Sequence, residues 1–167
     1  MKKYDLSKEY SNRPIKVLVL SKLEFNRDMM ENKLNDENIE DANIALISIN
    51  GTSGNEESWF KQDHSNVLRL WFDDVITDII ISPKESYRVF TQEQADKAID
   101  FIQKNKKRNF IIHCAAGISR SGSIGRFIVD YLEGDREYFE EHNKHILPNP
   151  KVSQLLYREG WKESKKN

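Results

Sequence analysis

Apolar and polar positions follow two different patterns along this chain of 167 residues. In some stretches apolar residues are nearly continuous or stand at every second position, as in buried strands. In others they recur every third or fourth position, as in helices that bury one face. The first pattern predicts four strands, at residues 16–20, 44–49, 67–72 and 109–113. The second predicts helices over residues 25–34 and 91–104, the latter opening on a capping box, Thr91-Gln-Glu-Gln94.

Helical spacing returns after the fourth strand. Apolar residues recur at this spacing over 124–131, and Gly134 is expected to end that helix. Asp135 is expected to cap a further short helix, and Asn149, which precedes a proline, to cap the last one. The polar stretch 52–66, which contains several turn residues, predicts a loop.

Strands that alternate with helices in this way predict an α/β domain. We expect a central, mostly parallel sheet of four to five strands flanked by helices. The length suits one domain, so residues 1–167 are expected to form a single unit. Because ligands bind at the carboxyl ends of the strands in such sheets, the segment after residue 113 is the first place to look for chemistry.

Composition and charge exclude several classes of protein. Lys and Arg number 26 and Asp and Glu 27, so the net charge of −1 gives no reason to expect nucleic acid or an anionic membrane as partner. The first ten residues are charged and lack the apolar core of a signal peptide. The longest apolar runs are far too short to span a bilayer. We therefore expect a cytoplasmic protein that makes no contact with membranes.

Cys114 is the only cysteine, which excludes an internal disulfide and a cysteine-rich zinc site. A lone cysteine is usually no more than a small buried apolar residue, but the neighbours of Cys114 favour chemistry. The small residues after it allow successive N–H groups to point inward and form a binding site for an anion. The following helix directs its positive N-terminus at the same point. Arg120 adds a planar cation that can bind two oxygens of a phosphate. Such surroundings lower the pKa of a thiol, and they would make Cys114 a nucleophilic thiolate.

The segment HCAAGISRSG, residues 113–122, resembles the signature loop of the protein tyrosine phosphatases, most closely that of their compact dual-specificity branch. The similarity rests on the Cys-x5-Arg spacing. The order of strands and helices around this loop is also similar, so the resemblance extends over roughly residues 40 to 160. It implies that Cys114 attacks phosphorus and that Ser121 donates a hydrogen bond to the thiolate. It gives His113 a supporting role. The implied phosphate ligands are the Arg120 side chain and the backbone N–H groups of Ala115, Ala116, Gly117, Ile118, Ser119 and Arg120. No metal and no cofactor is implied.

The resemblance also implies a carboxylic acid that protonates the leaving oxygen, on a loop after the strand 67–72. Two candidates follow that strand directly. The family pattern of apolar, any, apolar, any, Asp selects Asp74, while Asp73 and Asp78 stay as alternatives. Asp74 precedes Cys114 by 40 residues, more than in compact relatives, and the extra length falls in residues 75–90. That segment is either an elongated loop that covers the substrate or a surface insertion with its apolar residues tucked against the domain.

These features predict a cysteine-dependent phosphatase acting on phosphotyrosine in a protein or peptide, with phosphoserine and phosphothreonine left open. A phosphatase of RNA 5′-phosphates or of phosphoinositides is an alternative, although the loop lacks a lysine that could hold extra phosphates of an inositol lipid. A module that binds phosphotyrosine without turnover is another alternative, disfavoured because Cys, Arg and Asp are all present. His142 and His145 indicate surface residues rather than a metal site.

Overall fold

A central parallel sheet organises the fold. The structure, a computed structural model, describes residues 14–53 and 56–166, so the charged N-terminal segment lies outside the described residues. Within these ranges four strands pair in the order β1-β6-β2-β3, and every neighbouring pair is parallel. The strands are β1 (Val17–Ser21), β2 (Ile44–Asn50), β3 (Val67–Trp71) and β6 (Asn109–Cys114). The predicted α/β class and mostly parallel sheet are therefore confirmed.

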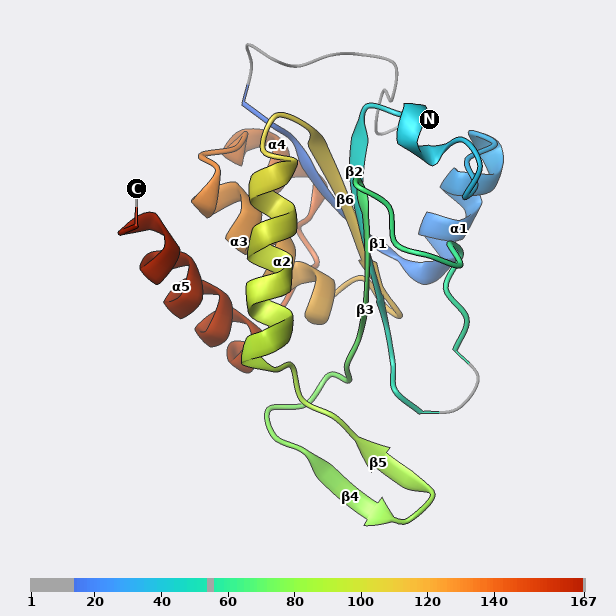
Figure 1. The fold of residues 1–167 in the computed structure, drawn as a ribbon, viewed down its shortest axis with the longest axis vertical. Coiled ribbons are helices and arrows are strands. Elements are labelled where there is room, and N and C mark those ends of the chain that lie inside the picture. Colours follow the sequence, from blue (N-terminus) through green and yellow to red (C-terminus); the bar gives the residue numbers. More distant parts are fainter. Residues whose placement is uncertain (1–13, 54–55, 167) are drawn as a thin grey trace.

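Helices cover both faces of the sheet, as Figure 1 shows. One face carries α1 (Lys22–Glu31) and the short 3-10 helix η1 (Ile39–Asp41). The other carries α2 (Gln92–Lys104), α3 (Arg120–Tyr131), α4 (Arg136–His142) and α5 (Pro150–Ser164). In β1, Val17 and Val19 join the core under α2–α5, whereas Leu18 and Leu20 join the core under α1. Because both faces are buried, the strands appear in the sequence as continuous apolar runs.

Side-chain caps fix most of the helix starts. The capping box at Thr91, the cap at Asp135 and the cap at Asn149 are all present, as predicted. The first helix, predicted over 25–34, instead begins at Lys22 and ends at Glu31. A second capping box, formed by Ser21 and Glu24, sets its start, and this Ser-x-x-Glu signal was present in the sequence.

The end of α3 departs from the prediction in its detail. The helix ends at Tyr131, and the left-handed residue after it is Glu133, with φ 52°, rather than Gly134. Gly134 is needed for a different reason, because a Cβ there would lie 3.0 Å from the carbonyl oxygen of Ile15. The glycine thus permits a close approach to the chain entering β1.

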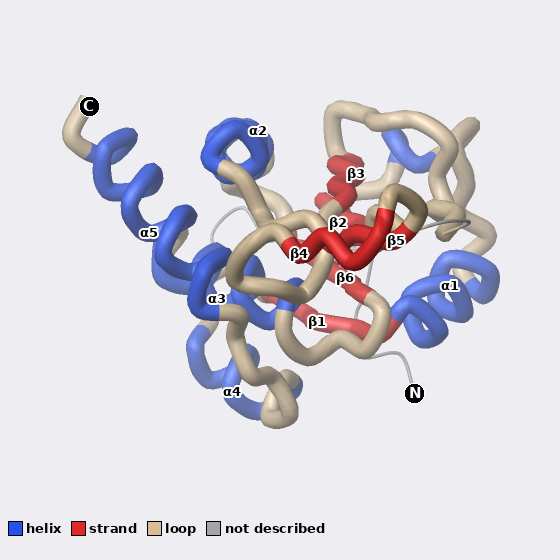
Figure 2. The backbone as a smooth tube through the Cα atoms, turned by 90° about the horizontal axis from the view of Figure 1, so that it is seen from below, coloured by secondary structure: helices blue, strands red, loops and turns tan. Residues whose placement is uncertain are grey.

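Residues 75–90 contain an antiparallel hairpin of β4 (Ile79–Ser82) and β5 (Glu85–Tyr87). Figure 1 shows it extending away from the sheet, beyond the end of β3, and Figure 2 shows it in front of the sheet when the domain is seen from below. Its isoleucines are exposed, so the alternative of an apolar segment tucked against the domain is wrong.

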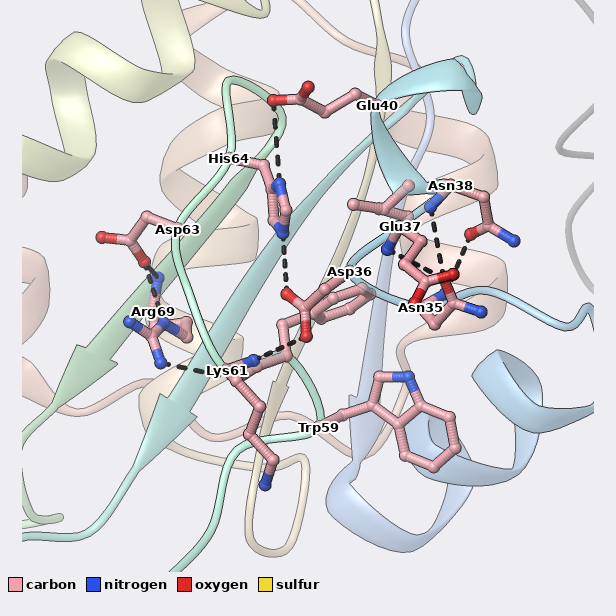
Figure 3. Close-up of polar contacts among 12 residues, drawn as sticks. Asn35, Asp36, Glu37, Asn38, Glu40, Trp59, Lys61, Asp63, His64 and Arg69 are labelled. Carbon is pink, nitrogen blue, oxygen red and sulfur yellow. Dashed lines mark hydrogen bonds and ion pairs between the residues drawn. The ribbon is translucent and has the colours of Figure 1, made fainter.

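The loop before β3 lacks regular structure, as predicted, yet polar contacts hold it in place (Figure 3). His64 Nε2 lies 2.8 Å from Asp36 Oδ1, and Trp59 Nε1 donates to the carbonyl of Leu34 at 3.0 Å. These contacts join the loop to the segment after α1. The same loop carries Ser58, which is buried and whose Oγ lies 3.4 Å from Ser48 Oγ in β2.

Candidate active site

The candidate residues meet at the carboxyl end of the sheet. Cys114 is the last residue of β6, beside Ser21 at the end of β1. The loop after it runs directly into α3, which begins at Arg120. Since the strands are parallel, the segments that follow β2 and β3 emerge at this same edge. The topology therefore brings the carboxylates after β3 next to the signature loop.

Gly117 sets the shape of that loop. Its φ is +71°, in the left-handed region that favours glycine. A Cβ at this position would lie 2.5 Å from the carbonyl carbon of Leu20 and from the nitrogen of Ser21. The Lys22 N–H donates to the carbonyl of Ala115 at 3.2 Å, and this bond further ties the loop to the end of β1. Only glycine fits where the loop turns against β1.

The Cys114 thiol is the centre of the loop and is 2% exposed. Its Sγ lies 3.0 Å from Ser121 Oγ, and the Gly117 N–H donates to it at 3.3 Å. Burial on its own acts to raise the pKa of this thiol. Hydrogen bonds from Ser121 and from the Ile118 N–H, together with the Arg120 charge, more than offset burial and hold the pKa below its usual value. The thiol is accordingly poised to ionise.

Arg120 is 9% exposed and is held from the side of β3. Its Nη1 donates to the carbonyl oxygen of Phe72 at 2.9 Å. That bond fixes the plane of the guanidinium, and a fixed planar fork suits two oxygens of one anion.

His113 lies beneath the loop rather than in it. Its Nε2 is 2.6 Å from Ser48 Oγ, which in turn lies 3.4 Å from Ser58 Oγ, and its Nδ1 is 3.4 Å from the Cys114 carbonyl. Burial lowers the pKa of His113 to about 4, so the ring is neutral at physiological pH. Sequence reasoning missed both serines. The available signal was a serine inside the buried strand 44–50, where a polar side chain needs a partner.

Asp73 is buried and tied to two other segments. Its carboxylate accepts hydrogen bonds from the Thr52 N–H at 3.0 Å, from the Thr52 hydroxyl, and from the Arg88 N–H at 2.7 Å. Burial acts to raise the pKa of Asp73, but these bonds and the charge of Arg120 hold it below its usual value. A carboxylate kept ionised in this way serves better as a structural tie than as a proton donor.

Asp74 is exposed and points to the signature loop. Its Oδ1 accepts hydrogen bonds from Ser119 Oγ at 2.7 Å and from Asn149 Nδ2 at 2.8 Å. The third alternative, Asp78, accepts from the Val89 N–H at 2.9 Å, at the base of the hairpin. Of the three acids, the geometry favours Asp74 for a role beside Cys114.

Asn149 is a site residue that the sequence reasoning identified only as a helix cap. Its Oδ1 does cap α5, accepting from the N–H groups of Lys151 and Val152. Its Nδ2 also donates to Asp74 and to the carbonyl of Val75 at 3.2 Å. The start of α5 therefore holds the loop after β3 against the signature loop.

A cleft of about 460 Å³ opens beside Arg120. Carboxylates from the segments after β2 and β3 form one part of its wall, and side chains of the hairpin form another. The lining residues are Gly51, Ser53, Glu56, Asp73, Asp74, Val75, Ile79, Tyr87 and Arg120. The inserted segment is thus part of the wall of the cleft.

Two further findings concern residues 14–53 and 56–166 only. No group of three or more His, Cys, Asp and Glu side chains there could hold a metal ion. His142 instead stacks on the ring of Tyr138, with centroids 4.0 Å apart. Nor is any helix among them long and apolar enough to cross a membrane.

Comparison of the sequence with protein-family models and with curated proteins gives no match. Solved structures do match in fold. A crystal structure of PTPMT1 aligns with a TM-score of 0.51 and 20% identity, covering 91% of this chain and 96% of that one. A structure of PTPMT1 in complex with PI(5)P aligns with a TM-score of 0.50 and 17% identity, covering 90% and 94%. Sequence identities this low support a shared fold and nothing further. The chain has the protein tyrosine phosphatase fold that the HCAAGISRSG segment led us to expect.

Proposed function

We propose that this chain is a cysteine-dependent phosphatase that hydrolyses phosphotyrosine in proteins or peptides. One observation carries the proposal: the buried Cys114 thiol has a lowered pKa and lies at the start of a loop that leads into α3 and Arg120. An anion bound in the loop would meet the thiolate, the guanidinium and the helix N-terminus together.

In the first step Cys114 Sγ attacks phosphorus, a sulfur–phosphorus bond forms, and the bond from phosphorus to the tyrosyl oxygen breaks. Asp74, protonated, gives its proton to that oxygen. Arg120 and the N–H groups of the loop bind the non-bridging oxygens, more tightly as charge builds up on them in the transition state.

In the second step water attacks the cysteinyl-phosphate, and the Asp74 carboxylate takes a proton from that water. The sulfur–phosphorus bond breaks, releasing inorganic phosphate and the Cys114 thiolate. Ser121 Oγ, 3.0 Å from Sγ, stabilises the departing thiolate with a hydrogen bond. His113 and Ser48 have a positioning role, because they hold the backbone at Cys114 from below.

The charge of the cleft supports a protein substrate. Among its described lining residues Arg120 is the only cation, and it faces the carboxylates of Glu56, Asp73 and Asp74. One phosphate matches that single cation. The further phosphates of a phosphoinositide, or the backbone of an RNA, would approach these carboxylates and be repelled.

We further propose that residues 1–167 act as one catalytic domain, because the site draws on segments from the end of β1 to the start of α5. The compartment that we propose is the cytoplasm, whose reducing conditions keep a lone nucleophilic thiol active.

The test is phosphate release from phosphotyrosine, phosphoserine and phosphothreonine peptides, from a phosphoinositide and from an RNA 5′-phosphate. Wild type, Cys114→Ser and Asp74→Asn are measured side by side. We expect release from the phosphotyrosine peptide by wild type and none by Cys114→Ser. Turnover that survives Cys114→Ser would refute the mechanism. A preference for RNA or lipid would refute the substrate, and binding without any release would identify a non-catalytic module.

A further inference from the structure

The β4–β5 hairpin exposes three consecutive isoleucines, and no other run of exposed large apolar side chains occurs among residues 14–53 and 56–166. Ile79, Ile80 and Ile81 are 43%, 67% and 60% exposed, and Ile76, just before the hairpin, is 64% exposed. Figure 1 shows these strands reaching out past the end of β3. A group of neighbouring isoleucines open to water is unfavourable unless something covers it during function.

The two faces of the hairpin have different surroundings. Ile79 pairs with Tyr87, so their side chains lie on one face, and both line the cleft beside Arg120. Glu85 shares this face, since the Tyr87 hydroxyl donates to its carboxylate at 3.3 Å. Ile80 pairs with Ser86, and the side chains of both lie on the opposite face. The apolar surface at Ile79 and Tyr87 is therefore continuous with the candidate active site.

The base of the hairpin is anchored. Asp73 accepts from the Arg88 N–H at 2.7 Å, and its own N–H donates to the Arg88 carbonyl, also at 2.7 Å. Asp78 accepts from the Val89 N–H at 2.9 Å. These bonds join the end of the hairpin, directly after β5, to the segment that also carries Asp74. The hairpin is thus held in a fixed relation to the proposed acid, as a wall of the cleft should be.

On the basis of the proposed function, we propose that Ile79 and Tyr87 form a docking surface. It would bind an apolar side chain next to the phosphorylated residue of an extended peptide substrate. A peptide whose phosphate lies at Arg120 must leave the cleft over one of its walls, and this wall is the apolar one. An anionic membrane would instead meet the Glu85 carboxylate on the same face, together with the carboxylates of the cleft, and would be repelled.

The test uses binding, measured by fluorescence anisotropy in a Cys114→Ser background, so that turnover does not intervene. Two phosphotyrosine peptides are compared that differ only in having Leu or Ser on either side of the phosphotyrosine. The affinity of each peptide is measured for the Cys114→Ser protein and for the same protein carrying Ile79→Ser or Ile80→Ser in addition. Ile80→Ser is the matched control, because it removes the same side chain, more exposed, from the other face.

We expect the Leu peptide to bind about fivefold more tightly than the Ser peptide, as burial of the exposed half of an isoleucine would give. The advantage should vanish in Ile79→Ser and persist in Ile80→Ser. An equal advantage in all three proteins, an equal loss in both variants, or no measurable binding of either peptide would overturn the proposal. A second overturning result would come from phosphatidylcholine vesicles that contain a phosphatidylinositol phosphate. It is that the protein binds these vesicles and that both variants weaken this binding equally. If wild type releases no phosphate while the Ile79 effect is present, the proposed catalysis fails and the docking surface stands.

Discussion

Two neighbouring carboxylates have opposite expected roles, and substituting each by asparagine separates them. In Asp73→Asn, an amide nitrogen replaces one carboxylate oxygen within a buried network. Whichever way the amide is turned, it faces an N–H or hydroxyl of Thr52 or the N–H of Arg88, and a buried donor loses its acceptor. Asp74→Asn differs, because the amide oxygen of an exposed side chain can still accept from Ser119 and Asn149.

The magnitude follows from these contacts. A hydrogen bond to a charged group contributes ~1.5–3 kcal/mol, and a buried donor left unpaired costs ~1–3 kcal/mol. We expect Asp73→Asn to lower the free energy of unfolding by about 3 kcal/mol, which for a chain of this size lowers Tm by roughly 6–12 °C. Asp74→Asn should change it by less than ~0.5 kcal/mol. Its kcat/KM for a phosphotyrosine peptide should fall by about 10²–10⁴, the contribution of a general acid.

The pH dependence of stability adds a second readout for Asp73. Its pKa is lower in the folded than in the unfolded chain, so its contribution is complete above the unfolded value of ~3.9. That contribution is lost as pH falls through the folded pKa. The difference in unfolding free energy between wild type and Asp73→Asn should therefore be full at neutral pH and shrink below about pH 4.

Urea unfolding followed by circular dichroism measures stability, and phosphate release well below both Tm values measures activity. The reasoning is refuted if Asp73→Asn is as stable as wild type, or if Asp73→Asn abolishes phosphate release while Asp74→Asn retains the kcat/KM of wild type.

Three further substitutions test the loop and its support. Ser121→Ala removes the hydroxyl beside Sγ and should raise the pKa of the Cys114 thiol, read from the pH dependence of iodoacetamide alkylation. An unmoved profile would contradict the role given to this serine. Gly117→Ala places a Cβ 2.5 Å from backbone atoms at a positive φ and should lower the free energy of unfolding, measured in urea, by about 2 kcal/mol or more. A variant as stable as wild type would show that the loop accommodates the added methyl group. Asn149→Asp keeps the cap of α5 but sets a second carboxylate against Asp74, so kcat/KM should fall about tenfold while the free energy of unfolding changes by less than ~1 kcal/mol. An unchanged kcat/KM would mean that Asn149 is only a cap.

The sequence alone predicted the sheet and the position of the signature loop because the signal for each lies in contiguous residues. A strand buried on two faces is an apolar run wherever it occurs, so four strands could be located without knowing their neighbours. The residues from His113 to Ser121 are contiguous, and their geometry follows from a strand, a tight turn and a helix start. The caps at Thr91, Asp135 and Asn149 are short-range signals of the same kind.

The tertiary structure decided what depends on partners distant in the chain. Asp73 and Asp74 are adjacent and chemically identical. They differ because Thr52 and Arg88 reach the first, while Ser119 and Asn149 reach the second.

In the same way, Ser48 and Ser58 acquire a role only when folding stacks them beneath His113. The hairpin became a wall of the cleft because hydrogen bonds at its base hold it beside the segment that carries Asp74. Hydrogen bonds between segments 15 to 75 residues apart carry no periodic signature. The sequence therefore determined which reactive side chains are present, and only the fold determined which carboxylate and which surface lie beside them.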